Sequence, residues 1–250
     1  MYRYLAWAGV LLLSFSSAVS TAAEAGEHRD KRALEVLEQM SSFKASLEAF
    51  RITGTSSRDV RLNAGLMMAV TEQVDVLLQR PGSINYSSFD GREYRRLILA
   101  DGQLALSDSE TATYATATVP KELDEALDVA LDVYEIDLPL MDLMHKNVAE
   151  RLLSSNDAVY YLGDRQRVGG VDCHQIAIRT EDVDVQLWVA QEGDPLPRKL
   201  VITDKWEGGA PRFVGRLQWD TSPDIPDGTF QFVPDEGAAR IQFINTIADE

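Results

Sequence analysis

The sequence predicts a mainly β, α+β fold: a strongly curved antiparallel half-barrel sheet with helices covering its concave side. Three observations lead to this fold class. Apolar and polar residues alternate over about a dozen short runs, Asp-Gly pairs separate several of these runs, and helical apolar spacing is confined to three stretches. A sheet with one apolar face buries that face against helices, so the two kinds of element are expected to form one core.

The N-terminus has the order of a secretory signal peptide. Arg3 precedes an apolar run over residues 5–19, and small residues follow at Ala22 and Ala23. A membrane-spanning helix needs about twenty apolar residues, whereas serines interrupt this run and Glu24 ends it. We therefore expect cleavage after residue 23, with Ala25 as a second choice, and export to the periplasm. Residues 24–250 form a single predicted domain, because no linker or repeat divides them.

Charge and cysteine content exclude several classes of function. The net charge of −16 disfavours binding to nucleic acid or to anionic lipid surfaces. Cys173 is the only cysteine, so an intramolecular disulfide is impossible and packing must stabilise the chain. An exported protein without disulfides suits a bacterial periplasm.

The first predicted element is one amphipathic helix over residues 29–50. Its apolar stripe has spacings of four, three, four and three residues. The stripe consists of Val36, Met40, Phe43, Leu47 and Phe50.

The period changes to two after this helix, which predicts an antiparallel meander. Val70, Val74, Val76 and Leu78 alternate with polar residues. Strands are then expected at 83–89, 93–99, 103–107 and 112–117. Asp-Gly pairs at 90–91 and 101–102 favour tight turns between them.

A helical insertion interrupts the strands. Residues 120–134 share an apolar face, and a further helix is expected from Asp137, with Pro139 in its first turn, to Leu152. The remaining runs predict strands at 158–162, 171–179, 183–190, 197–206 and 213–220, with a final pair at 229–233 and 240–245.

No constellation of residues indicates catalysis or a metal. Cys173 and His174 are adjacent in a strand, so their side chains should point to opposite faces and cannot form a direct dyad. The three histidines are scattered, and neither a phosphate-binding glycine loop nor a nucleophile elbow is present. We therefore predict a protein without enzymatic activity, cofactor or metal.

Three tryptophans bear on the interior. Trp188 is out of phase with Val185 and Leu187, so it either packs on the outer face or is turned inward by a bulge. Trp206 and Trp219 are in phase with apolar neighbours and are assigned to the inward set, as core or as cavity lining.

Five segments in a fixed order resemble a family of predicted periplasmic proteins, domain of unknown function 2092. They are DAVYYLG at 157–163, GVDCH at 170–174, VQLW at 185–188, PLPRKL at 195–200 and FQFVP at 230–234. The resemblance is clearest over residues 157–241 and looser over 72–120. That family is similar to the superfamily of periplasmic lipoprotein carriers and their outer-membrane lipoprotein receptors. Receptor-type members are themselves lipoproteins, and this chain lacks the N-terminal cysteine for that.

The resemblance implies an apolar cavity for acyl chains and no catalytic residues. The leading hypothesis is therefore a periplasmic carrier or sensor that binds an acyl chain, a lipid or a lipidated protein. The alternatives are a regulatory or scaffolding module that binds another envelope protein and, least favoured, a Cys/His hydrolase. The inward phase of strands and helix stripes predicts ten cavity-lining residues: Met40, Phe43, Leu47, Val74, Val76, Leu140, Met144, Leu187, Trp206 and Trp219.

Overall fold

The computed structural model describes residues 28–63, 65–136, 138, 140–206 and 208–243. The predicted signal peptide at 1–23 and its cleavage site lie outside these described residues. Twelve strands of the described part form one sheet, in the order β12-β6-β5-β4-β3-β2-β1-β11-β10-β9-β8-β7. The strands are β1 (Ala49–Arg61), β2 (Met67–Gln79), β3 (Ser83–Phe89), β4 (Tyr94–Ala100), β5 (Gln103–Asp108), β6 (Thr113–Thr118), β7 (Ala158–Val168), β8 (Val171–Arg179), β9 (Val183–Ala190), β10 (Pro197–Asp204), β11 (Arg212–Asp220) and β12 (Ala239–Arg240).

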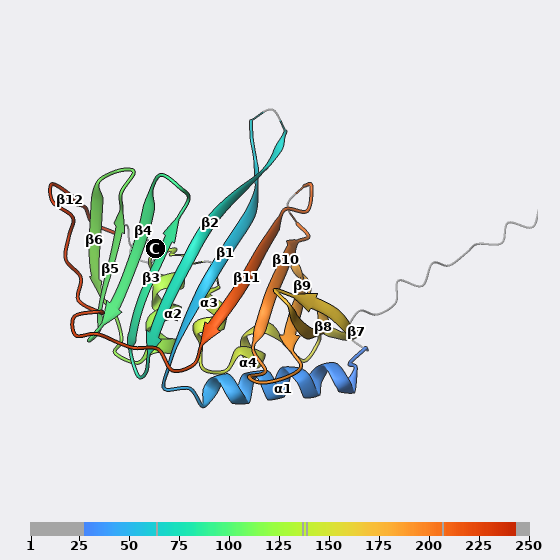
Figure 1. Cartoon of the computed structure of the whole chain (residues 1–250). Coiled ribbons are helices and arrows are strands. Elements are labelled where there is room, and N and C mark those ends of the chain that lie inside the picture. The colour runs from blue at the N-terminus through green and yellow to red at the C-terminus, as the bar shows by residue number, and fades with distance from the viewer. Residues whose placement is uncertain (1–27, 64, 137, 139, 207, 244–250) are drawn as a thin grey trace, which may run out of the picture.

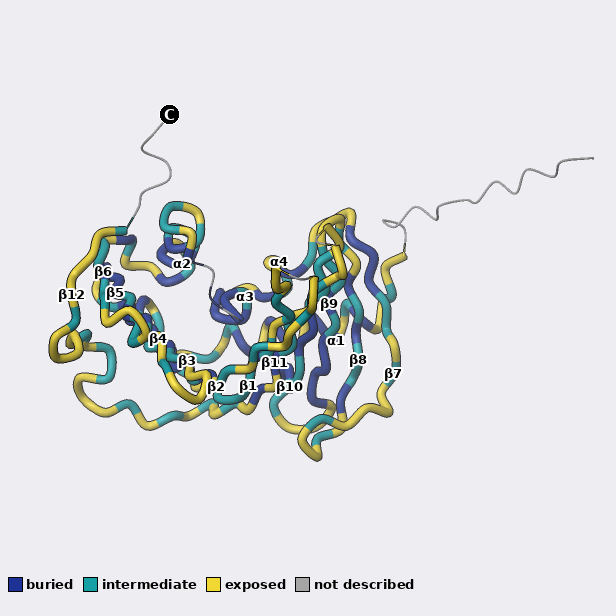
Figure 2. The backbone as a smooth tube through the Cα atoms, turned by 90° about the horizontal axis from the view of Figure 1, so that it is seen from above, coloured by how far each residue is buried: buried dark blue, intermediate teal, exposed yellow. Residues whose placement is uncertain are grey.

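The sheet curls around a hollow that the helices occupy, which confirms the predicted fold class (Figures 1 and 2). The helices are α1 (Lys31–Ala45), α2 (Leu123–Asp132), α3 (Met141–Met144) and α4 (Val148–Leu152). Figure 2 shows α2, α3 and α4 inside the curve of the sheet. All strand pairs are antiparallel except β12 with β6, which is parallel. Helix α1 packs against β7 and α4.

The first helix is shorter than predicted, and the strand that follows it was missed. Helix α1 ends at Ala45, and Phe50, expected on its stripe, is fully buried in β1. Strand β1 is central in the sheet, between β2 and β11. Its sequence gave no strand signal because its inward residues change from apolar Phe50 and Ile52 to Gly54, Ser56 and Arg58, which removes the apolar alternation.

The Asp101-Gly102 turn forms as expected. Both residues have positive φ, 53° and 74°, the backbone that a tight two-residue hairpin turn requires. The turn joins β4 to β5. These two strands pair from Ala100 opposite Gln103, next to the turn, to Arg95 opposite Asp108.

The predicted helix from Asp137 to Leu152 is two short helices. Asp137 and Pro139 lie outside the described residues. The break falls between α3 and α4, where Lys146 donates its backbone N–H to the Asp124 carboxylate at 2.8 Å instead of to a helical carbonyl. The buried ammonium of Lys44 also donates to the His145 carbonyl oxygen. These tertiary bonds replace the helical ladder at this point.

The predicted strand at 229–233 is wrong. Thr229 N–H donates to the Pro226 carbonyl in a turn, and the Thr229 carbonyl accepts from the Asn85 side chain at 2.7 Å. The segment after β11 crosses the sheet to its far edge, where Ala239 and Arg240 pair with β6 (Figure 1). Prolines and glycines in this stretch favour a turn-rich path rather than a regular ladder.

Candidate functional site

The strand register divides the concave face into an apolar half and a polar end. Residues opposite one another on neighbouring strands form rows across the sheet. The two innermost rows are almost wholly apolar: Phe50, Leu78, Ile84, Leu99 and Leu104, then Ile52, Val76, Tyr86, Leu97 and Leu106. The next row contains Ser88, Arg95 and Asp108, and beyond it lie the pair Ser56 and Glu72 and then Arg58. On β1–β5 the concave face therefore changes from apolar to charged along the strands.

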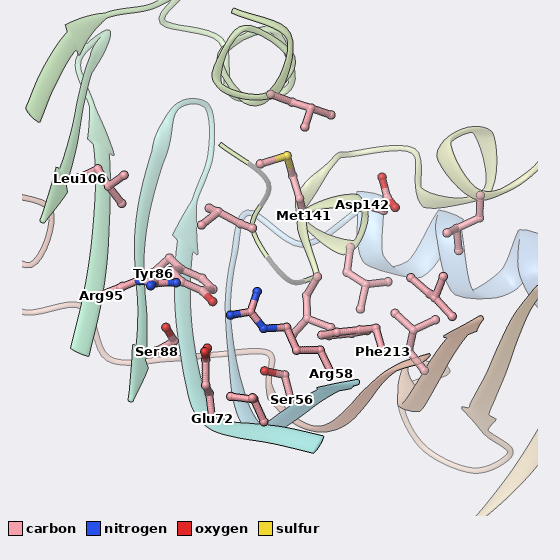
Figure 3. Close-up of a pocket in the computed structure, with 18 residues that line it drawn as sticks. Ser56, Arg58, Glu72, Tyr86, Ser88, Arg95, Leu106, Met141, Asp142 and Phe213 are labelled. Atoms are coloured by element: carbon pink, nitrogen blue, oxygen red, sulfur yellow. The ribbon is translucent and has the colours of Figure 1, made fainter. Parts of the chain in front are cut away.

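A cavity of about 440 Å³ lies between this face and the helices (Figure 3). Ligand pockets in proteins span roughly 300–1,000 Å³ and are mostly apolar, so its size and composition fit a ligand site. Most of its lining is apolar. These residues are Leu131, Leu138, Leu140, Met141, Leu143 and Leu152 from the helical insertion and Val70, Leu106, Leu200, Ile202 and Phe213 from the strands.

Most of the polar lining side chains lie on the β1–β4 wall of the cavity, where Figure 3 shows Ser56, Arg58, Glu72, Tyr86, Ser88 and Arg95, whereas Asp142 lines the cavity from α3. Arg95 is ion-paired with Asp108 at 2.9 Å. Burial raises the pKa of Tyr86 to about 12, against an opposing effect of its hydrogen bond with Ser88. Tyr86 therefore presents a neutral hydroxyl at neutral pH, and the wall combines hydroxyl groups with charges of both signs.

A second cavity of about 740 Å³ adjoins the first and shares Arg95, Leu106 and Leu138 with it. The C-terminal segment forms one of its walls through Phe243, whose ring lies 5.0 Å from that of Tyr134. Together the two cavities extend the apolar hollow from β10 to β6.

The ten predicted cavity residues are distributed over the interior, and Leu140 is the one that lines the first cavity. Others lie in the packed core beneath it, namely Met40, Val74, Val76, Met144 and Leu187. Leu47 and Trp219 are partly buried against that core, and Phe43 is half-buried on α1. A ligand-binding role for these residues stays a prediction.

The inward assignment of Trp206 is wrong. Its side chain is 71% exposed, and its indole N–H donates to Asp182 at 2.7 Å. Strand β10 ends at Asp204, so the alternation that placed Trp206 inward no longer applies there.

The sequence prediction missed most of the cavity lining, both its apolar residues and the polar residues of the β1–β4 wall. Ser56 and Arg58 belong to the unpredicted strand β1, and Glu72 and Arg95 are charged residues at inward positions of β2 and β4. In the sequence, Glu72 alternates in step with Val74 and Val76, and Arg95 with Leu97 and Leu99. This alternation shows that the two charged side chains face inward only when the pairing of the strands is known.

Cys173 and His174 point to opposite faces of β8. Cys173 is fully buried in a small outer cluster with Trp188 and Val201, so Trp188 packs on the outer face, the first of its two predicted arrangements. Burial raises the pKa of the Cys173 thiol. The imidazole Nδ1 of His174 instead contacts the Tyr161 hydroxyl at 2.8 Å.

The described residues contain neither a metal-binding group of side chains nor a membrane-spanning helix. No group of three or more His, Cys, Asp or Glu side chains in this part of the chain is arranged to hold a metal ion. Within the same part, every helix is too short or too polar to cross a membrane.

Several solved structures are similar to this chain. Lipoprotein LppX of Mycobacterium tuberculosis is 11% identical, with 80% of this chain and 100% of that chain covered and a TM-score of 0.48. LprF of Mycobacterium bovis is 12% identical, with 80% and 98% covered and a TM-score of 0.48. A LolA superfamily protein of Nitrosomonas europaea is 12% identical, with 80% and 97% covered and a TM-score of 0.39.

No curated protein matches the chain in sequence. A family model does match, over residues 33–244, and this span includes every strand described above and nearly all of α1. The chain therefore belongs to the family described as predicted periplasmic protein (DUF2092).

Proposed function

We propose that this protein is a periplasmic carrier that binds the acyl chain of an amphiphile in the cavity between its curled sheet and its helices. The observation that supports this proposal is the cavity of about 440 Å³ with apolar walls on both sides and charged groups at one end. The cavity is open to water, and apolar lining in contact with water is unfavourable. A bound apolar chain would cover that lining.

The size of the cavity sets the expected affinity. A methylene group takes about the space of one water molecule, roughly 30 Å³, so about fifteen such groups fit. Burying them contributes about 12 kcal/mol at roughly 0.8 kcal/mol each. Association costs at least about 4 kcal/mol, which leaves at most about 8 kcal/mol and therefore a Kd in the micromolar range or weaker. This affinity suits a carrier that must release its cargo.

Uptake of a fluorescent fatty acid by the purified protein tests the proposal, together with mass spectrometry of lipids that co-purify without detergent. Ile202→Trp should weaken uptake at least tenfold, because Ile202 lines the cavity and the larger ring would occupy it. Thr203→Trp is the matched control, since Thr203 points to the other face of the same strand. No uptake by the unaltered protein, or equal uptake by both variants, would refute the proposal.

A further inference from the structure

Two oppositely charged side chains on the cavity wall are unpaired. Arg58 of β1 and Glu72 of β2 both line the first cavity. They are near neighbours, since Glu72 lies opposite Ser56, two residues before Arg58 on β1. Among the described residues, neither forms an ion pair or a side-chain hydrogen bond. Figure 3 shows their charged ends directed toward the same space, in front of Tyr86.

Several other charged residues on neighbouring strands form pairs, such as Arg51 with Asp75, Arg95 with Asp108 at 2.9 Å and Arg179 with Asp184 at 2.9 Å. A guanidinium and a carboxylate that share a cavity without contacting each other each keep their hydrogen-bonding capacity for another group.

Arg58 and Glu72 lie where the head group of a bound acyl chain would be. They follow the apolar rows on the concave face and occupy its polar end. Phe213 of β11 lies directly opposite Arg58, so an acyl chain that lies against Leu106 and Phe213 would bring its head group beside Arg58 and Glu72, with the hydroxyls of Ser56, Tyr86 and Ser88 near it.

The charged side chains around Arg58 and Glu72 indicate which head group the site can bind. A smaller recess of about 100 Å³ continues from this point and is lined by Arg58 and Arg95 together with five carboxylates: Glu72, Asp90, Glu93, Asp108 and Glu110. Because Asp108 already pairs with Arg95, Arg58 is the unpaired cation of this recess among the described residues. A purely anionic head would meet one free guanidinium and an excess of carboxylates, and a purely cationic head would be repelled by the Arg58 guanidinium.

We propose that this site selects a zwitterionic amphiphile, whose phosphate binds Arg58 and whose ammonium group binds Glu72. The inference rests on the proposed function, because the acyl chain is what brings the head group to this wall. It adds the chemical class of the cargo, which the apolar cavity alone does not determine.

Competition against a bound, uncharged fluorescent acyl probe tests this inference. The competitors share one palmitoyl or hexadecyl chain and differ in the head: lysophosphatidylethanolamine, lysophosphatidylglycerol and hexadecyltrimethylammonium, each below its critical micelle concentration. The zwitterionic competitor should bind at least tenfold more tightly than either of the others. Arg58→Gln should weaken it about tenfold and leave the cationic competitor unaffected or improved. Glu72→Gln should remove most of the preference over the anionic competitor.

Matched controls lie on the outer face of the same two strands. Arg51→Gln and Asp75→Asn change the same charges on β1 and β2 away from the cavity, so they should leave all three affinities unchanged. Equal affinity for the three heads, or equal effects of the inward and outward variants, would overturn the inference while leaving an acyl carrier in place. Failure of the uncharged probe to bind would instead overturn the proposed function itself.

Discussion

Lys44 on α1 should make the stability of this protein depend on pH. Its side chain is 1% exposed, its ammonium donates to the His145 carbonyl oxygen, and the ring of Phe50 lies 5.6 Å away. Burial, followed by repulsion from Arg80, lowers the pKa of Lys44 from 10.5 to about 7, against a smaller opposing effect of Asp124. This lysine lies where α1 meets the segment between α3 and α4.

The direction of the effect follows from the two pKa values. Between pH 7 and 10.5 the unfolded chain holds a proton on Lys44 that the folded chain has released, so the free energy of unfolding rises with pH. Below pH 7 Lys44 is charged in both the folded and the unfolded chain, so the full cost of burying its ammonium group is present. Each pH unit within this window is worth about 1.4 kcal/mol, so stability should increase by about 2–3 kcal/mol between pH 7 and pH 9.

Urea unfolding of the wild type and of Lys44→Met at pH 6, 7, 8 and 9 measures this contribution. The stability of the variant relative to the wild type should fall by about 2–3 kcal/mol from pH 7 to pH 9, because the variant lacks the titrating group. Lys31→Met on the same helix is the control, since the Lys31 side chain is 92% exposed. A difference between Lys44→Met and the wild type that is the same at all four pH values would refute the reasoning, because Lys44 would then keep its ordinary pKa when folded.

Three further substitutions test the packing around the site. An added Cβ at Gly54 would lie 1.9 Å from the carbonyl oxygen of Arg216 on β11, so Gly54→Ala should lower the free energy of unfolding in urea by about 1–3 kcal/mol; an unchanged value would show that β1 and β11 do not approach so closely. Leu104→Ala removes a fully buried side chain and should cost about 2–5 kcal/mol in the same assay, whereas a loss below 1 kcal/mol would argue against a packed inner row. Cys173→Ala should leave acyl-probe binding unchanged, because Cys173 lies on the outer face of β8; loss of binding would contradict that placement.

The candidate site was only partly accessible to sequence reasoning. Within a strand or helix, inward phase marks a residue as interior, but it fails for Trp206 beyond the end of β10, and it does not separate core from cavity lining. Met40 and Leu187 pack in the core, whereas Leu140 faces the cavity. The difference depends on how far the helices stand from the sheet, which is a property of tertiary packing.

The polar wall was missed for a different reason. Arg58 and Glu72 are charged residues, and charged residues are normally assigned to the solvent face of a strand. Their inward orientation becomes visible only from the pairing of β1 with β2, which places Arg58 opposite Val70 and Glu72 opposite Ser56.

The local elements of this protein, namely the β2–β6 meander and the β7–β11 hairpins, can be predicted from the amino-acid sequence, with boundaries at most six residues from those observed. Alternation and turn residues report these elements because neighbouring strands in a hairpin are close in the chain and one of their faces is mostly apolar. By contrast, the pairing of β1 with β2 and β11, which joins the two halves of the sheet, becomes apparent only from the folded structure. Arg51 of β1 lies opposite Asp220 of β11, although most of the chain separates them in sequence. Such a contact leaves no local sequence pattern, because its free energy depends on closing the whole sheet around the helices.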